Sequence, residues 1–352
     1  MGIVGAGNAA HSLAAYLASL GHSVHMLARN PLCAEILRAR GRVFATGKLE
    51  GVYRLSHATC DPERIAGECR TVFVATTTDA YAEVAARLAP HLTPEHELIL
   101  FSGKLGGCLE VRHVLDRHGV SGVTVLETDA LFASRLQQDG SIWIRGIKKW
   151  NLYCSPTRSQ TRANGAILER YFSGLEPADN AVQRGVTDFG AMAHPLTMLV
   201  NMNRVDRQES FLFYCEGFTE RTVRLLEAVE GEFRAVARAY QTDLIPAPEL
   251  LNRYYGCCTS SLLEAMRSVP NYRTSYAPLS LEHRYLREDV ACTLVPLQAL
   301  ARVAGVDTPV VDSVLNLACV VTGEDFARTG RSLARLGLDG LDRSQILARL
   351  QA

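Results

Sequence analysis

The sequence has no surplus of charge of either sign and no long apolar run. Lysine and arginine together number 37, as do aspartate and glutamate, so the formal net charge is zero. Without a basic surplus there is no electrostatic case for binding nucleic acid or an anionic membrane. No apolar stretch approaches the roughly 20 residues that a membrane-spanning helix needs. We therefore expect neither nucleic acid nor a membrane as a partner.

Targeting and metal-binding patterns are also missing. The rather apolar start of the chain lacks a basic region and is broken by Gly7, Asn8 and His11, which argues against a secretory signal. The ten cysteines include no C-x-x-C pair, and the ten histidines show no zinc-ligand spacing; His113 and His118, for example, would not share a helix face. These absences predict a cytoplasmic protein with reduced thiols and no metal site.

Two domains are expected for a chain of 352 residues, of which 47% are hydrophobic. The first half alternates strand and helix patterns, and helical patterns alone fill most of the second half. The sequence predicts an α/β domain over residues 1–175 and an all-helical domain over residues 176–352. The expected elements are a hairpin-like stretch at 42–55, helices at 33–40 and 81–88, strands at 71–75, 98–101 and 123–126, two further strands at 141–145 and 150–154 around 146–149, and helices at 216–240, 260–267, 285–304, 310–317 and 325–336.

A glycine-rich turn opens the chain. Gly5-Ala6-Gly7-Asn8-Ala9-Ala10 lies between a short apolar strand and a helical pattern, as the G-x-G-x-x-A form of the dinucleotide-binding fingerprint does. Gly5 permits the turn, Gly7 lets a pyrophosphate approach the backbone, Ala10 allows close helix packing, and the helix N-terminus attracts the phosphates. The pattern predicts a Rossmann domain with a redox cofactor; the alternative is a glycine turn in another α/β domain. Because only four residues precede Gly5, we also expect the natural N-terminus to lie upstream of Met1.

The end of the second predicted strand bears on the choice of cofactor. NAD-preferring domains place an acidic residue there for the ribose 2′-hydroxyl, whereas this chain has Arg29 followed by Asn30. An arginine suits the 2′-phosphate of NADPH through charge-assisted hydrogen bonds. We therefore expect NADPH, with NADH as the other possibility; the structural alternative is a solvated surface arginine.

Small and polar residues follow three later strands, at the edge where parallel sheets bind ligands. In chain order, the three pairs are Thr76 and Thr77, Ser102 and Gly103, and Glu127 and Thr128. We expect the first two pairs to contact the cofactor, the second of them on the nicotinamide side. We expect the third pair to bind the amino group of a substrate.

Two segments of the second half carry residues suited to acid–base chemistry and anion binding. His194 precedes Pro195, which we expect in the first turn of a helix over 196–202, and a neutral imidazole there can exchange a proton near neutral pH. Asp289 is expected at the start of a helix over 290–304, with Arg284 five residues before it. Taken singly, these residues could be a structural histidine, an acid that complements the helix dipole and a surface cation. Sequence distance alone does not show that they meet.

Taken together, the motifs resemble the opine dehydrogenase family, which includes octopine and nopaline dehydrogenases and the bacterial N-(1-carboxyethyl)-norvaline dehydrogenases. The resemblance covers nearly the whole chain, and the His-Pro and Arg-x4-Asp segments are specific to the family. The matching stretches are 5–11, 127–128, 192–196, 255–256, 284–290, 308–312 and 331–338.

The resemblance implies a Rossmann domain followed by a helical domain, often in a homodimer. It also implies an NAD(P)-dependent oxidoreductase acting on a CH–NH bond: an amino acid and an α-keto acid condense to an imine, which is reduced to an N-(carboxyalkyl) amino acid. By match of position, His194 becomes the general acid–base, Asp289 the carboxylate that orients it, and Arg284 the clamp for a substrate carboxylate.

Two details refine this expectation. Arg29 replaces the acidic residue of NAD-using members, which supports NADPH. Residues 76–81 and 146–149 are similar to the staphylopine- and pseudopaline-type synthases, which make metal-binding opines with NADPH, so an opine metallophore is one possible product. The chain lacks the longer C-terminal region of those enzymes, and the amino acid and keto acid stay open.

Two other functions fit a two-domain plan of this kind. One is a ketopantoate-type or 3-hydroxyacid reductase; the region after Phe189 offers His194 and no lysine, which weighs against the lysine-dependent version. The other is a cofactor-sensing protein without turnover. The presence of His194, Arg284 and Asp289 weighs against it.

Overall fold

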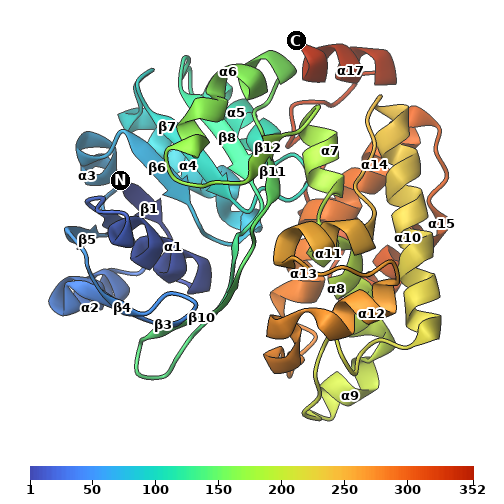
Figure 1. Ribbon diagram of the computed structural model, residues 1–352. Helices are drawn as coiled ribbons and strands as arrows, with labels where there is room; N and C mark the ends of the chain where they lie inside the picture. Colours follow the sequence, from blue (N-terminus) through green and yellow to red (C-terminus); the bar gives the residue numbers. More distant parts are fainter. The chain divides into compact units, whose positions relative to one another are not determined.

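The computed structural model describes residues 1–352, and contacts along the chain divide it into two compact units. The first unit comprises residues 1–103, 107–156 and 160–177. The second comprises residues 178–352 together with two short segments from the first half, 104–106 and 157–159. The first unit contains the sheets and the second the long helices, which confirms the predicted α/β plus all-helical fold (Figure 1).

An eight-stranded sheet forms the centre of the first unit, in the order β12-β11-β8-β7-β6-β1-β2-β5. All pairs are parallel except β11 with β8. Every residue of β6 and β7 is buried, as expected for strands covered on both faces. The strands are β1 (Gly2–Val4), β2 (His25–Leu27), β5 (His57–Thr59), β6 (Thr71–Val74), β7 (Glu97–Phe101), β8 (Thr124–Thr128), β11 (Asn151–Cys154) and β12 (Leu175–Pro177).

Helices cover this sheet, and aromatic rings fill the core on one side. The ring of Phe172 lies 5.9 Å from that of Phe101 and 5.4 Å from that of Tyr16, both stacked. The helices are α1 (Asn8–Ser19), α2 (Pro31–Arg40), α3 (Pro62–Glu68), α4 (Tyr81–Leu88), α5 (Gly107–Arg117) and α6 (Arg158–Glu169), of which α4 matches its predicted bounds.

A second sheet of four strands packs beside α1 in the order β4-β3-β10-β9, formed by β3 (Arg42–Gly47), β4 (Gly51–Arg54), β9 (Phe132–Leu136) and β10 (Ile142–Ile147). The antiparallel pair β3–β4 confirms the predicted hairpin. The two strands expected at 141–145 and 150–154 exist as β10 and β11, but they lie in different sheets. Burial alternates along β10, as in a strand with one covered face, whereas all of β11 is buried.

The second unit is helical apart from one isolated bridge. Its longest helix, α10 (Glu220–Ala239), buries Val223, Leu226, Val229 and Phe233 along one face at helical spacing. The other helices are α7 (Ala181–Val186), α8 (Phe189–Val200), α9 (Met202–Asp206), α11 (Ala247–Tyr255), α12 (Leu262–Ser268), α13 (Arg284–Asp289), α14 (Val295–Ala304), α15 (Pro309–Thr322), α16 (Phe326–Thr329) and α17 (Arg343–Gln351). None of the helices has the length and apolar character needed to cross a bilayer.

The helix predicted over 325–336 is much shorter, because α16 ends at Thr329. Gly330 lies so close to its surroundings that an added Cβ would stand 2.6 Å from the Phe326 carbonyl oxygen. The chain turns there, and the Arg331 N–H donates to the Ala291 carbonyl oxygen at 2.8 Å.

A π-helical turn, Val290–Leu294, joins α13 to α14 without a break. Pro296 lies in the first turn of α14 and has no N–H to donate backwards. The carbonyls of Ala291 and Cys292 accept instead from Arg331 and Leu105, at 2.8 and 3.2 Å. The proline and the π-helical turn thus leave two carbonyls available, one of which binds Leu105 of the 104–106 segment.

Candidate functional site

The turn after β1 lies where the strand order reverses, since β1 pairs with β2 on one side and β6 on the other. Gly5 has a φ of +129°, and an added Cβ would stand 2.6 Å from the carbonyl oxygen of Ala75 at the end of β6. Only glycine fits this conformation and this approach. Ligands of open parallel sheets bind at such a switch point.

The start of α1 has the features of a phosphate site. Gly7 is the N-cap, no side chain caps the helix, and its first turn has no acidic residue. An added Cβ at Gly7 would meet nothing within 4 Å, so the space above the backbone is open. Ala10 is fully buried beneath the turn, and Ala9 is half-buried. The backbone N–H groups of this turn fit the pyrophosphate of a dinucleotide.

Three other residues predicted to contact the cofactor have different surroundings. The side chain of Asn8 accepts from the Leu136 N–H at 2.8 Å and so ties α1 to β9. Arg29 is exposed at the end of β2. Asn30 caps α2 by accepting from the Leu32 N–H at 2.9 Å, which leaves Arg29 as the charged group at this strand end.

Residues at the ends of β6 and β7 lie along the same edge of the sheet. Thr76 is half-buried and Thr77 exposed. The Ser102 hydroxyl donates to Asp129 Oδ1 at 3.2 Å, and Asp129 also forms an ion pair with Lys148. Gly103 packs against the next strand, where an added Cβ would stand 2.4 Å from the Glu127 carboxyl group.

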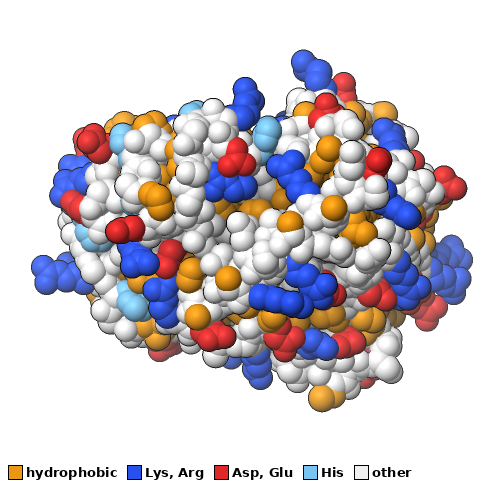
Figure 2. Space-filling view, turned by 90° about the horizontal axis from the view of Figure 1, so that it is seen from above, with side chains coloured by type: hydrophobic (Ala, Val, Ile, Leu, Met, Phe, Trp, Pro, Cys, Tyr) orange, Lys and Arg blue, Asp and Glu red, His pale blue; other side chains and the backbone are white.

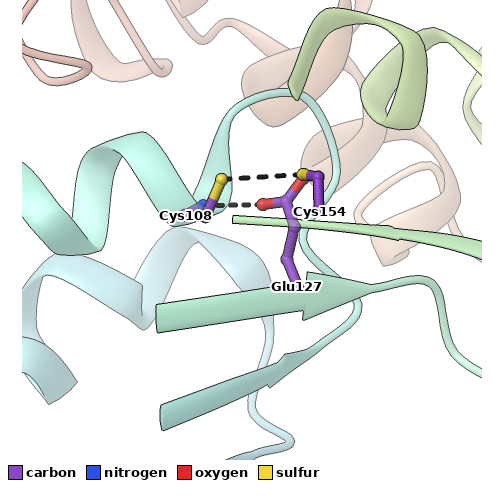
Figure 3. A group of neighbouring side chains, drawn as sticks. All are labelled: Cys108, Glu127 and Cys154. Atoms are coloured by element: carbon purple, nitrogen blue, oxygen red, sulfur yellow. Dashed lines mark hydrogen bonds between the residues drawn. The ribbon is translucent and has the colours of Figure 1, made fainter. Parts of the chain in front are cut away.

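Glu127 and Thr128 are fully buried in the first unit. Glu127 Oε2 accepts from the Cys108 N–H at 2.6 Å, so the carboxylate stabilises the N-terminus of α5 (Figure 3). The Thr128 hydroxyl donates to the Leu152 carbonyl oxygen at 3.0 Å. These bonds give both residues a structural role, and their predicted contact with substrate stays a prediction.

Cys108, Glu127 and Cys154 form a buried group that sequence spacing did not reveal, because each residue comes from a different element (Figure 3). Their ligand atoms all lie within 4.8 Å of one another, and the two sulfur atoms are 3.8 Å apart. Two thiols and a carboxylate are a donor set that suits Zn²⁺. The absence of a metal site therefore stays a prediction.

His194 lies inside α8, in the second unit. The helix begins at Phe189 after Asp188, whose Oδ1 accepts from the Ala191 N–H at 3.1 Å as an N-cap. The expectation that Pro195 stands in the first helical turn is therefore wrong. An aspartate before an apolar run is itself a helix-start signal, which the more conspicuous proline obscured.

Both ring nitrogens of His194 are hydrogen-bonded. Nδ1 lies 2.7 Å from Asp289 Oδ2, and Nε2 lies 2.7 Å from the Tyr214 hydroxyl. Because the carboxylate only accepts, Nδ1 carries the proton and Nε2 accepts from Tyr214. The imidazole also stacks on Tyr285 with 3.8 Å between ring centroids. Sequence reasoning found His194 and Asp289 but missed Tyr214.

Asp289 is the last residue of α13 and not the first of the following helix, which corrects its predicted position. Burial raises the pKa of its carboxyl group, but the Lys104 ammonium and the His194 hydrogen bond outweigh burial and hold the pKa at about 2. Burial also lowers the pKa of His194, which the bond to Asp289 only partly opposes. The pair is therefore a carboxylate and a neutral imidazole near pH 7, and Nε2 carries no proton.

Arg284 stands at the other end of α13. Its side chain is 57% exposed and forms an ion pair with Glu288 at 3.3 Å. The structure brings His194 and Asp289 into direct contact, whereas Arg284, the first residue of α13, pairs with Glu288. A guanidinium so placed can bind a carboxylate through two N–H groups.

Lys104 is a further charged residue of this site, and sequence reasoning missed it. Its Nζ lies 3.0 Å from Asp188 Oδ2 and 2.5 Å from Asp289 Oδ1. The region after Phe189 has no lysine, as the sequence analysis noted, but Lys104 from the first half of the chain joins this site. Lys104 precedes Asp188 by 84 positions, so no spacing links them; the available signal was a lysine inside the glycine-rich run that follows β7.

A full-length relative decides the family. The opine dehydrogenase of Arthrobacter sp. (strain 1C) is 31% identical over 99% of this chain and 98% of its own length. The chain belongs to the opine dehydrogenase family. As an opine dehydrogenase, it is an NAD(P)-dependent oxidoreductase acting on CH–NH bonds.

Family models divide the chain as the fold does. Residues 177–322 match the alpha-helical domain of NAD/NADP octopine/nopaline dehydrogenase, and residues 1–149 match the ketopantoate reductase PanE/ApbA family. Octopine dehydrogenase in complex with NADH and agmatine covers 100% of this chain and 98% of its own, with a TM-score of 0.78 at 20% identity. NADP⁺-bound yersinopine dehydrogenase covers 99% and 96%, with a TM-score of 0.71 at 17% identity. These structures share the fold, and the cofactor of this opine dehydrogenase is a nicotinamide dinucleotide.

Proposed function

We propose that this opine dehydrogenase uses NADPH to condense the amine of an amino acid with an α-keto acid and to reduce the resulting imine to an N-(carboxyalkyl) amino acid. The observation that carries the proposal is the buried His194–Asp289 pair, with Arg284 on the same helix as the aspartate. The bound nicotinamide supplies the hydride. Residues 1–175 would hold the cofactor and residues 176–352 the substrates.

His194 has two proton transfers to perform in this reaction. A neutral Nε2 takes a proton from the substrate ammonium group, so that the free amine can attack the keto carbon. The imidazolium then returns that proton to the carbinolamine hydroxyl, which leaves as water and gives the protonated imine (the iminium ion). Asp289 holds Nδ1–H throughout and stabilises the charged ring between the two transfers.

Arg284 is proposed to bind the keto-acid carboxylate, because its exposed guanidinium is the cation nearest the pair on α13. Glu127 and Thr128 remain candidates for the substrate amino group, and Glu127→Gln tests this. The amide oxygen can still accept from the Cys108 N–H, so stability should be kept. If Glu127 binds the ammonium group, KM for the amino acid rises while the melting temperature is unchanged; an unchanged KM leaves Glu127 as a helix cap alone.

NADPH preference is proposed from Arg29, which is exposed at the end of β2 with no acidic neighbour in the turn. The solved relatives include one with NADH and one with NADP⁺, so family membership leaves the choice open. The products of the staphylopine-type branch bind metals, and an opine metallophore is one product we propose to test.

We also propose a homodimer formed through the helical unit. Leu317 and Val320 lie one turn apart on α15 and are 50% and 79% exposed. Light scattering on the purified protein should give twice the 38.5 kDa chain mass, and Val320→Asp should lower it. A monomeric mass for the unsubstituted protein contradicts the dimer.

Substrate omission tests the proposed reaction. NADPH oxidation is measured with an amino acid alone, with pyruvate, oxaloacetate or 2-oxoglutarate alone, and with each combination. The proposal expects oxidation only when both substrates are present. Oxidation with a keto acid alone indicates a hydroxyacid-type reductase, and no oxidation with any pair of a broad amino acid panel, including histidine-derived metallophore precursors, indicates a cofactor-sensing protein.

A further inference from the structure

Lys104 connects two buried carboxylates of the second unit. Its side chain is 7% exposed, and those of Asp188 and Asp289 are each 2% exposed. Both carboxylates also use their other oxygen, since Asp188 Oδ1 caps α8 and Asp289 Oδ2 bonds to His194. The Asp289 carboxylate is therefore shared, with one oxygen on the ammonium group and the other on the imidazole.

The backbone around Lys104 is fixed as firmly as its side chain. Lys104 has a φ of +57°, which costs a residue with a Cβ on the order of 1 kcal/mol. Three hydrogen bonds hold the segment in this conformation. Arg184 donates to the Lys104 carbonyl at 3.3 Å, Leu105 donates to the Cys292 carbonyl at 3.2 Å, and Arg331 donates to the Leu105 carbonyl at 3.1 Å.

Two of these partners are themselves unusual. The side chains of Arg184 and Arg331 are fully buried, and each serves a carbonyl group of this three-residue segment. Gly185 leaves room for Leu105, since an added Cβ would stand 2.3 Å from Leu105 Cδ1. The fold thus places one lysine ammonium group against Asp289.

The position of the ammonium group has a consequence for His194. A histidine bonded to a lone buried carboxylate is easily protonated, because the carboxylate stabilises the imidazolium. Here a permanent cation already occupies the other oxygen of that carboxylate and repels a second positive charge. Asp188 pairs with the same ammonium group and partly offsets it.

We propose that Lys104 is a positioning residue for the reaction, which orients Asp289 toward His194 and takes up enough of its charge to keep the imidazole neutral until substrate binds. The inference deepens the proposed function, because it rests on His194 acting as the acid–base group. It is consistent with the lowered pKa of His194, where burial is the main cause, Asp289 opposes it, and Lys104 and Arg284 add to it.

Several other groups face His194 and remain in place in every variant tested. Four of them belong to α13 or to its N-cap, and the fifth is the tyrosine that contacts Nε2. These groups are His283, Arg284, Tyr285, Glu288 and Tyr214.

The test follows the titration of His194 by NMR in protein labelled at histidine Cε1, with the signal assigned by its loss in His194→Gln. Lys104→Met removes the cation, so the pKa of His194 should rise by roughly one unit or more. Lys104→Arg keeps the cation and should stay close to the unsubstituted protein. An unchanged titration in a folded Lys104→Met protein overturns the proposal.

Asp188→Asn provides a matched variant with the opposite sign, and it serves if Lys104→Met does not fold. Asparagine retains the N-cap of α8 but removes an anion from Lys104. The lysine then acts more strongly on Asp289, and His194 should be harder to protonate than in the unsubstituted protein. A rise in the pKa of His194 in Asp188→Asn contradicts the inference. So does an unchanged pKa of His194 in both Asp188→Asn and Lys104→Met.

The acid limb of kcat/KM should move with the NMR pKa, upwards in Lys104→Met and downwards in Asp188→Asn. A purely structural lysine would lower kcat or stability and leave this limb in place. If the NMR pKa moves as expected but NADPH oxidation never requires an amine, the role of Lys104 stands and the proposed reaction fails.

Discussion

The two units prepare for chemistry in different ways. In the first unit the proposed cofactor region is made of backbone: a glycine at φ +129°, an open N-cap glycine and the uncapped start of α1. In the second unit the proposed reactive region is made of side chains from four separate segments, with Lys104, His194, Tyr214 and Asp289 in one hydrogen-bonded group. A backbone site occupies one short run of sequence, whereas a side-chain site has to be assembled by the fold.

Charges of both signs lie on the protein surface (Figure 2). Acidic and basic side chains are interspersed on the face shown in Figure 2, as the equal numbers of the two charges suggest. The charges in contact with His194 and its partners are instead buried, as Asp289 and Lys104 are.

The largest effect expected from breaking the side-chain site is that of His194→Ala. Loss of the acid–base group should lower turnover by about 10²–10⁴-fold, while NADPH binding stays near normal because the first unit is untouched. Stopped-flow kinetics measure turnover, and a fluorescence titration measures NADPH affinity. His118→Ala, on an exposed histidine of the first unit, is the control. Survival of turnover would show that His194 is a structural residue.

Arg29→Asp tests the one side chain on which the cofactor preference depends. The aspartate would repel the 2′-phosphate and suit the ribose hydroxyl of NADH. Losing one charge-assisted hydrogen bond of about 1.5–3 kcal/mol should lower the ratio of kcat/KM for NADPH over NADH by roughly 10- to 100-fold. The exposed Arg162→Asp should leave the ratio unchanged. An NADH preference in the unsubstituted enzyme contradicts the assignment.

Substitutions at Gly5 and Gly7 distinguish an effect on folding from an effect on cofactor binding. Gly5→Ala should lower the free energy of unfolding by about 1–3 kcal/mol, because the Cβ meets the Ala75 carbonyl at a positive φ. Gly7→Ala has open space and a φ of −91°, so unfolding should change by less than about 0.5 kcal/mol. Its methyl group should instead weaken NADPH binding. Denaturant unfolding and NADPH titration measure both; equal NADPH affinity in Gly7→Ala would contradict the phosphate site.

The smallest effect concerns His283, which caps α13 by accepting from the Tyr285 N–H through Nδ1. Burial, with Arg284 nearby, lowers its pKa to about 4. Because the folded pKa lies below the unfolded value of about 6.5, stability is full above that pH and is lost as the pH falls towards 4. His283→Asn keeps an N-cap that does not titrate and should reduce this loss by up to about 1 kcal/mol. Identical stability–pH curves for both proteins would exclude His283 as a source of acid sensitivity.

The comparison also explains what the sequence could predict. The glycine turn, the helix at 81–88 and the hairpin over β3 and β4 are local patterns, and the structure has all three. Strands β10 and β11 were predicted as segments, but their membership of different sheets depends on partners far away in the chain. The start of α8 was missed because Pro195 is a stronger local signal than the Asp188 cap.

The candidate site depends even more on contacts between residues that are distant in the sequence. His194 and Asp289 are 95 positions apart, and only the family resemblance joined them before the structure did. Lys104 could not be placed by spacing, since the segment 104–106 interrupts the first unit and belongs to the second. Local sequence specifies where a backbone can bind phosphate; only the packed helices specify which charges a histidine meets.

Isotope transfer distinguishes reduction of an imine from reduction of a free keto acid. NADPH carrying deuterium at the transferable C4 position is incubated with the enzyme, an amino acid and an α-keto acid, and the products are separated by mass spectrometry. We expect a secondary amine that contains both carbon skeletons and one deuterium on the former keto carbon. A deuterated 2-hydroxy acid, with the amino acid recovered unchanged, would contradict it.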